Sequence, residues 1–110
     1  MLVAPCTGNT LAKLANSIVD TSVTMAVKSH LRNNKPVVIA VSTNDALSGS
    51  AKNIGALLNL RNYYFVPMRQ DNPEGKPTSI VADFNLIPQT LEEALQNIQI
   101  QPVMLERKPT

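Results

Sequence analysis

The first residues that could bind a ligand form a run of small and polar side chains, Thr7-Gly8-Asn9-Thr10, directly after Cys6. An apolar stub precedes this run and a helical pattern follows it, which predicts a strand-to-helix loop. Small residues let a planar ring approach the backbone, and the free N–H groups of a helix start favour electron-rich oxygens. A plain capped turn explains the same spacing, and on spacing alone it is the better explanation.

A second polar loop, Ser42-Thr43-Asn44-Asp45, follows the apolar run Val37-Val38-Ile39-Ala40-Val41. Such a run is typical of a strand buried on both faces of a parallel sheet. Open α/β sheets bind their ligands outside the carboxyl ends of the strands, where both loops would lie. Asn44 could orient a substrate carboxylate through its amide N–H, or it could be an ordinary turn residue.

Two further groups of side chains allow chemistry. Cys6 could be a nucleophile only as a stabilised thiolate, and no His or Lys lies close to it in the sequence; a small, buried packing residue is the better interpretation. Arg69 and Lys76 flank a loop rich in proline and could bind a dicarboxylate, although solvated loop charges are the slightly better explanation.

The elements that would position these loops alternate between strand and helix patterns. Strands are predicted at residues 2–4, 37–41 and 63–66 from their apolar and β-branched content. Helical spacing separates them, with Asn9 or Thr10 capping the first helix and Asp20-Thr21-Ser22 capping the second. The alternation predicts an α/β domain, a Rossmann-like, flavodoxin-like parallel sheet with flanking helices in three layers.

The last part of the chain carries weaker signals. Residues 67–79 contain three prolines and are predicted as a loop, followed by a short extended piece at 80–84. Thr90 with Glu93 fits a capping box at the start of a final helix. Residues 1–110 are predicted to form one domain with a loose tail at 99–110. Three strands are fewer than the five or six of a doubly wound sheet, so an N-terminal half is expected to be missing.

Composition excludes several classes of protein. A hydrophobic content of 44% and a charged content of 16% indicate a globular chain, and a net charge of +2 is too weak for a nucleic-acid footprint. One Cys and one His exclude a disulfide framework and the usual zinc motifs, so no metal site is predicted. No apolar run is long enough to span a membrane and no signal peptide is recognisable, so a cytoplasmic location is expected.

Residues 4–16, Ala-Pro-Cys-Thr-Gly-Asn-Thr-Leu-Ala-Lys-Leu-Ala-Asn, resemble a motif of the homo-oligomeric flavin-containing cysteine decarboxylase superfamily. There, Pro-Ala-Ser-Ala-Asn-Thr leads into an Ile-Ala-Lys-Ile-Ala-Asn-Gly helix. Residues 42–47 lie where that superfamily has Pro-x-Met-Asn-x-x-Met. The chain departs from both motifs, with Cys6-Thr7-Gly8 for Ala-Ser-Ala and Ser42-Thr43 for Pro-x-Met. The superfamily's phosphate-binding turn and active-site histidine have no match, since His30 does not correspond to that histidine.

The resemblance implies that FMN lies against Cys6, Thr7, Gly8, Asn9 and Thr10, and that Asn44 faces the substrate side of the ring. The likeness is greatest to a branch of oxidoreductases active in spore formation, and it is carried by residues 42–45, 51–55, 64–67, 70–73 and 76–77. In that branch a flavoprotein-type subunit works with a second subunit of nicotinamide-type fold on a small dicarboxylate. A homo-oligomer is expected, and no catalytic residue is assigned. A non-catalytic assembly subunit, or a flavin-dependent decarboxylase or prenyltransferase, is the alternative.

Overall fold

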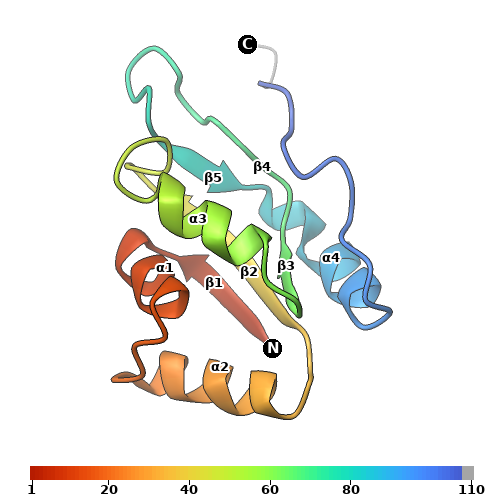
Figure 1. The fold of residues 1–110 in the computed structure, drawn as a ribbon. Helices are drawn as coiled ribbons and strands as arrows, with labels where there is room; N and C mark the ends of the chain where they lie inside the picture. Colours follow the sequence, from red (N-terminus) through yellow and green to blue (C-terminus); the bar gives the residue numbers. More distant parts are fainter. Residues whose placement is uncertain (108–110) are drawn as a thin grey trace.

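Three parallel strands form the centre of the sheet (Figure 1). Strand β1 (Leu2–Cys6) pairs with β2 (Val37–Thr43), and β2 pairs with β3 (Tyr63–Phe65), both in parallel register. The computed structural model describes residues 1–107; residues 108–110, the end of the predicted tail, lie outside the described residues. The three predicted strands are therefore confirmed, and each continues or ends within two residues of its expected boundary.

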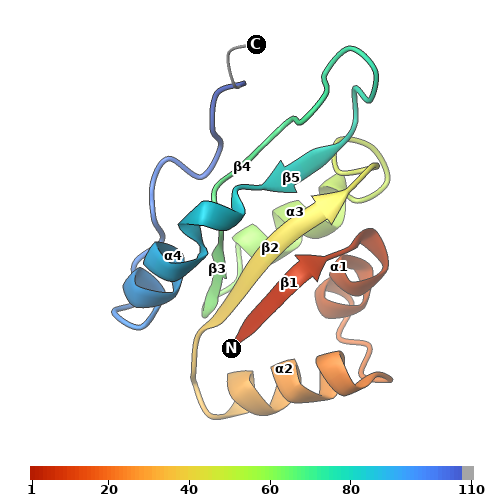
Figure 2. The same ribbon diagram turned by 180° about the vertical axis from the view of Figure 1, so that it is seen from behind.

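The helices form a layer on each face of the sheet. Helices α1 (Gly8–Ala15) and α2 (Ser22–Arg32) connect β1 to β2, and α3 (Ala51–Leu58) connects β2 to β3. Their apolar residues share one core cluster, whereas α4 (Ile87–Ala94) contributes to a second cluster with Val38 and Ala40. Accordingly, α3 lies in front of the sheet in Figure 1 and α4 lies in front in Figure 2. The three-layer, Rossmann-like and flavodoxin-like α/β architecture is confirmed.

Strand β2 is the middle of both cores because it is apolar on both faces. Residues Val37 to Val41 are all fully buried. Val37, Ile39 and Val41 contact the α1–α2–α3 side, and Val38 and Ala40 contact the α4 side, as the alternation of side chains along a strand requires.

The sheet is mixed, which the expectation of a wholly parallel sheet did not include. Two short strands, β4 (Met68–Arg69) and β5 (Ile80–Ala82), pair with each other antiparallel, and β5 pairs antiparallel with the end of β2. Residues 67–79, predicted as a loop, thus begin with a strand. No helix separates β4 from β5, and a direct chain reversal makes neighbouring strands antiparallel.

Two predicted helix starts are wrong. Helix α1 begins after Thr7, not at Asn9 or Thr10, because β1 continues through Cys6 and Thr7 is the extended N-cap residue. Helix α4 begins at Ile87, directly after the 3₁₀ turn η1 (Phe84–Leu86), so Thr90 lies inside the helix. The Thr90 hydroxyl is buried and donates to the carbonyl oxygen of Leu86 at 2.7 Å, a bond within the helix that competes with capping.

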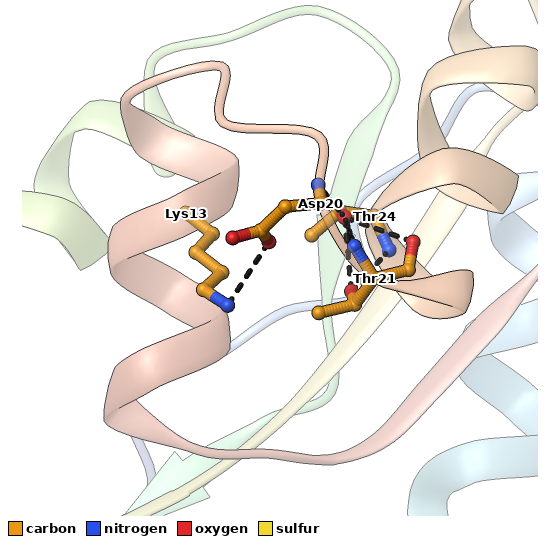
Figure 3. Close-up of polar contacts among 4 residues, drawn as sticks. All are labelled: Lys13, Asp20, Thr21 and Thr24. Atoms are coloured by element: carbon orange, nitrogen blue, oxygen red, sulfur yellow. Dashed lines mark hydrogen bonds and ion pairs between the residues drawn. The ribbon is translucent and has the colours of Figure 1, made fainter.

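The predicted cap of the second helix is confirmed. Thr21 precedes α2, its hydroxyl accepts from the backbone N–H of Thr24 at 3.1 Å, and its own N–H donates to the Thr24 hydroxyl at 2.9 Å. Asp20 ion-pairs with Lys13 of α1 at 3.0 Å (Figure 3). The turn between α1 and α2 is therefore held by the ion pair to α1 and by the capping hydrogen bonds at the start of α2.

The segment predicted as a loose tail is tied to the sheet over its described part. The Gln99 side chain accepts from the N–H of Phe65 and donates to its carbonyl oxygen, both at 2.7 Å. Further on, Met68 N donates to Val103 O and Leu105 N donates to Met68 O, both at 2.8 Å. These bonds cover the outer edges of β3 and β4, which unpaired strands would leave open to other chains.

Candidate functional site

The two predicted loops meet at Gly8, the first residue of α1. A methyl group built on Gly8 would lie 3.0 Å from Ser50 Oγ and 3.1 Å from both Asp45 Oδ1 and Thr43 Oγ1. These distances are tighter than ordinary van der Waals contact, so a methyl group at position 8 would push these side-chain oxygens back by a few tenths of an ångström. The carboxyl ends of β1 and β2 therefore form one continuous surface, as expected for neighbouring parallel strands.

Asp45 organises the second loop. Its Oδ1 accepts from Thr43 Oγ1 at 2.6 Å and from Ser50 Oγ at 2.8 Å. These two hydrogen bonds, the one from Thr43 first, lower the pKa of Asp45 from its usual value although desolvation opposes them. The carboxylate is therefore charged at neutral pH and lies beside the positive end of the α1 dipole.

The start of α1 presents backbone donors without acceptors. The first helical bond runs from Leu11 N to Thr7 O at 2.9 Å, which leaves the N–H groups of Gly8, Asn9 and Thr10 without an acceptor among residues 1–107. Thr7 and Asn9 are exposed, and no side chain caps the helix. Such free N–H groups can donate to the carbonyl and nitrogen acceptors of a planar ligand.

Asn44 lies beside this surface and is held by a segment far along the chain. Its carbonyl oxygen accepts from Thr78 Oγ1 at 2.6 Å, and its Oδ1 is 3.5 Å from the hydroxyl of Ser79. The side chain is exposed, and its amide N–H₂ has no acceptor in the described part of the chain. Asn44 can therefore donate to a substrate oxygen from a fixed position.

Cys6 lies beneath the first loop rather than on it. Its side chain is fully buried at the end of β1, and burial raises the pKa of the thiol to about 12. The thiol is therefore neutral at physiological pH and unsuited to nucleophilic chemistry. A ligand in the loop could therefore contact Cys6 only through the backbone of that residue.

Arg69 and Lys76, the second predicted place for a dicarboxylate, differ in their surroundings. Arg69 Nη1 ion-pairs with Asp83 Oδ2 at 3.2 Å, and its Nε donates to Glu106 O at 3.2 Å. Lys76 is exposed in the loop. A cavity of about 660 Å³ includes Arg69, but Asp71, Glu74 and Asp83 line it as well. The arginine is already paired, so the cavity is not an evident carboxylate site.

Sequence reasoning missed the hydroxyls and the carboxylate that connect the loops. The sequence pattern predicts no more than a turn around Thr43 and Asp45, whereas the structure joins them with Ser50 into one cluster against Gly8. An Asp flanked by hydroxyl residues after a buried strand is a usable signal for such a cluster, since Asx side chains accept from nearby donors. Thr78 and Ser79 carry no comparable local signal.

The α/β layers, with loops at the carboxyl ends of neighbouring parallel strands, are the architecture of nucleotide- and flavin-binding α/β domains. The protein-family model described as Flavoprotein matches residues 1–94, and the chain belongs to that family. No helix among the described residues is long and apolar enough to cross a membrane, and no cluster of potential metal ligands occurs among them.

Within this family, the similarity to one kind of protein is high. The chain is 48% identical over 106 residues to the dipicolinate synthase B subunit of Bacillus subtilis (strain 168), an alignment covering 96% of this chain and 53% of that protein. The crystal structure of the dipicolinate synthase B subunit from Bacillus halodurans C superposes with a TM-score of 0.96 at 48% identity, over 98% of this chain and 55% of that one. The chain thus spans about half the length of these relatives.

Proposed function

We propose that this chain provides the flavin-facing loops of a dipicolinate synthase B subunit, with FMN as the flavin. The supporting observation is the surface at Gly8, where unpaired backbone donors of α1 meet the loop that carries Asn44. The high identity to two B subunits and the Flavoprotein family membership support the same assignment. FMN, when bound, supplies reversible hydride chemistry that the side chains of this site lack.

In this proposal, the residues of the chain bind and orient. Backbone N–H groups of Gly8, Asn9 and Thr10 donate to the ring edge, and the Thr7 hydroxyl adds a further donor. The absence of a side chain at position 8 lets the second loop close against the first. Asn44 donates its amide N–H to a carboxylate of the substrate, a small dicarboxylate precursor of dipicolinate from the dihydrodipicolinate pathway.

The proposed partner is the dipicolinate synthase A subunit, because the relatives are B subunits of that enzyme. The proposal places the complex in the cytoplasm of a spore-forming cell and assigns it an oxidoreductase activity. It also includes assembly of the B subunit with copies of itself.

Asn44→Ala tests the proposed substrate contact. In the complete B subunit carrying this sequence, assayed with the A subunit for dipicolinate formation, the variant should raise KM for the dicarboxylate while flavin binding is unchanged. Asn85→Ala, another exposed asparagine, is the matched control and should behave as the wild type.

A complex that forms dipicolinate without any flavin would contradict the proposal and favour a purely structural role for the chain.

A further inference from the structure

An apolar groove lies between α1 and α2, away from the proposed flavin surface. Its volume is about 190 Å³, enough for a single large apolar side chain. Most of its lining is aliphatic, and its members come from both helices, their connection and β3: Leu14, Ile18, Val19, Val27, Leu31 and Tyr63. Ile18 and Val19 are 46% and 38% exposed, so the groove opens to the surface.

Two lysines flank this groove. Lys13 contributes to one wall, where its ammonium group pairs with Asp20 at 3.0 Å (Figure 3). Lys28 contributes from α2, is exposed, and forms no ion pair within residues 1–107. The groove therefore suits an apolar side chain with a carboxylate beside it.

The end of α4 presents such a group. Leu95, the residue that ends α4, is 75% exposed, more than any other large apolar side chain in the described part of the chain. Ile98 is 46% exposed, and Glu92, three residues before Leu95, is exposed and forms no ion pair within residues 1–107. Residues three apart lie on one face of a helix, so Glu92 and Leu95 project together.

The charges of the two regions are opposite. Residues 7–36 carry three lysines and one arginine against the single acid Asp20, whereas residues 84–101 carry the two acids Glu92 and Glu93 and no lysine or arginine. Helices α1 and α2 pack on one face of the sheet and α4 packs on the other (Figures 1 and 2). The end of α4 therefore cannot reach the groove of its own chain.

We propose that the α1–α2 groove receives Leu95 from a second copy of this chain, with Glu92 of that copy beside Lys28. The two surfaces are different parts of the molecule, so the contact is head-to-tail and builds a ring or an open chain of subunits. An apolar side chain buried at the centre with polar and charged groups at the rim matches the general arrangement of protein interfaces. The contact needs no flavin, but it rests on the self-assembly that the proposed function includes and names the surfaces that would make it.

Charge reversal tests the contact in the full 110-residue chain by sedimentation equilibrium. Lys28→Glu places a second carboxylate against Glu92, and Glu92→Lys places a second ammonium group against Lys28. Each variant alone should therefore associate about tenfold more weakly than the wild type. In an equimolar mixture the unmodified groove of one variant meets the unmodified helix end of the other, so association should return. Lys52→Glu, an exposed lysine on α3, is the matched control and should associate as the wild type.

Leu95→Asp separates this contact from any other mode of association. Leu95 is mostly exposed, so the variant should fold, as thermal unfolding can confirm, while association is lost. Leu60→Asp, at another exposed leucine, should have no effect on association. A monomeric wild type, unchanged association of Leu95→Asp, or failure of the two charge variants to associate when mixed would each overturn the proposal.

Discussion

Gly8 and Asp45 bring the two loops of the proposed site into contact. The Asp45 Oδ1 atom lies 3.1 Å from the position that a Gly8 methyl group would occupy, and the hydroxyls of Ser50 and Thr43 bonded to this oxygen lie 3.0 and 3.1 Å from the same position. The loop after β2 can therefore pack this closely against the start of α1 only while position 8 has no side chain. Substitutions at Gly8 and at Asp45 both probe this contact between the loops.

Gly8→Ala should destabilise the protein by about 1 kcal/mol, because the oxygens around the new methyl group must shift by a few tenths of an ångström. Urea unfolding measures this change. Gly55→Ala is the control, because nothing lies within 4 Å of its added methyl group in helix α3, and it should stabilise by about 0.5–1 kcal/mol. Equal effects at both glycines would mean that the loops do not close at Gly8.

Asp45 should make stability depend on acid pH. Hydrogen bonds from Thr43 and Ser50 lower its pKa in the folded protein below the usual 3.8, so the stability that they add is complete above that value and is lost as the pH falls through the folded pKa. The difference in unfolding free energy between the wild type and Asp45→Asn should therefore shrink below about pH 4. Asp71→Asn, which removes an exposed loop carboxylate, is the control for the change of charge alone.

Cys6 should resist alkylation in the folded protein. Its pKa of about 12 leaves almost no thiolate at neutral pH, and its side chain is fully buried. Iodoacetamide labelling followed by mass spectrometry should be slow until urea unfolds the chain. The pKa of the Cys6 thiol in the folded protein lies above the usual 9.0. The contribution of the buried neutral thiol to the unfolding free energy is therefore complete below pH 9.0 and is lost as the pH rises further, because the unfolded chain releases the proton first. Rapid labelling of the native protein would contradict this account.

The two ion pairs made by arginine should differ in strength. Arg69 and Asp83 are each only 16% exposed, and removing one partner leaves a charge in a poorly hydrated place, so Asp83→Asn should cost about 1–3 kcal/mol. Glu74→Gln breaks the pair with Arg107, whose partners are 79% and 51% exposed, and should cost less than about 0.5 kcal/mol. Thermal unfolding of both variants makes the comparison, and equal losses would contradict it.

The residue pattern was sufficient to predict the three parallel strands, since an apolar run such as Val37 to Val41 is typical of a strand buried on both faces. It also indicated both loops and the cap at Thr21, which depend on local residue types. It also indicated the extended piece at 80–84 that contains β5. It could not predict β4 or the antiparallel pairing of β4 and β5, because that pairing is made by residues distant in the chain. The contacts of Gln99 with Phe65 are equally non-local, which is why the sequence alone predicts a loose tail.

The most direct test of the proposed flavin site is a titration of FMN, followed by flavin fluorescence. The protein is this chain joined to the part of the Bacillus subtilis relative that it does not cover, as wild type, Gly8→Val and Gly55→Ala, each checked for folding by circular dichroism. Saturable quenching with the wild type and Gly55→Ala, and binding at least about tenfold weaker with Gly8→Val, is the predicted result. No quenching with the folded wild type, or equal binding by Gly8→Val, would contradict a flavin held against residues 7–10.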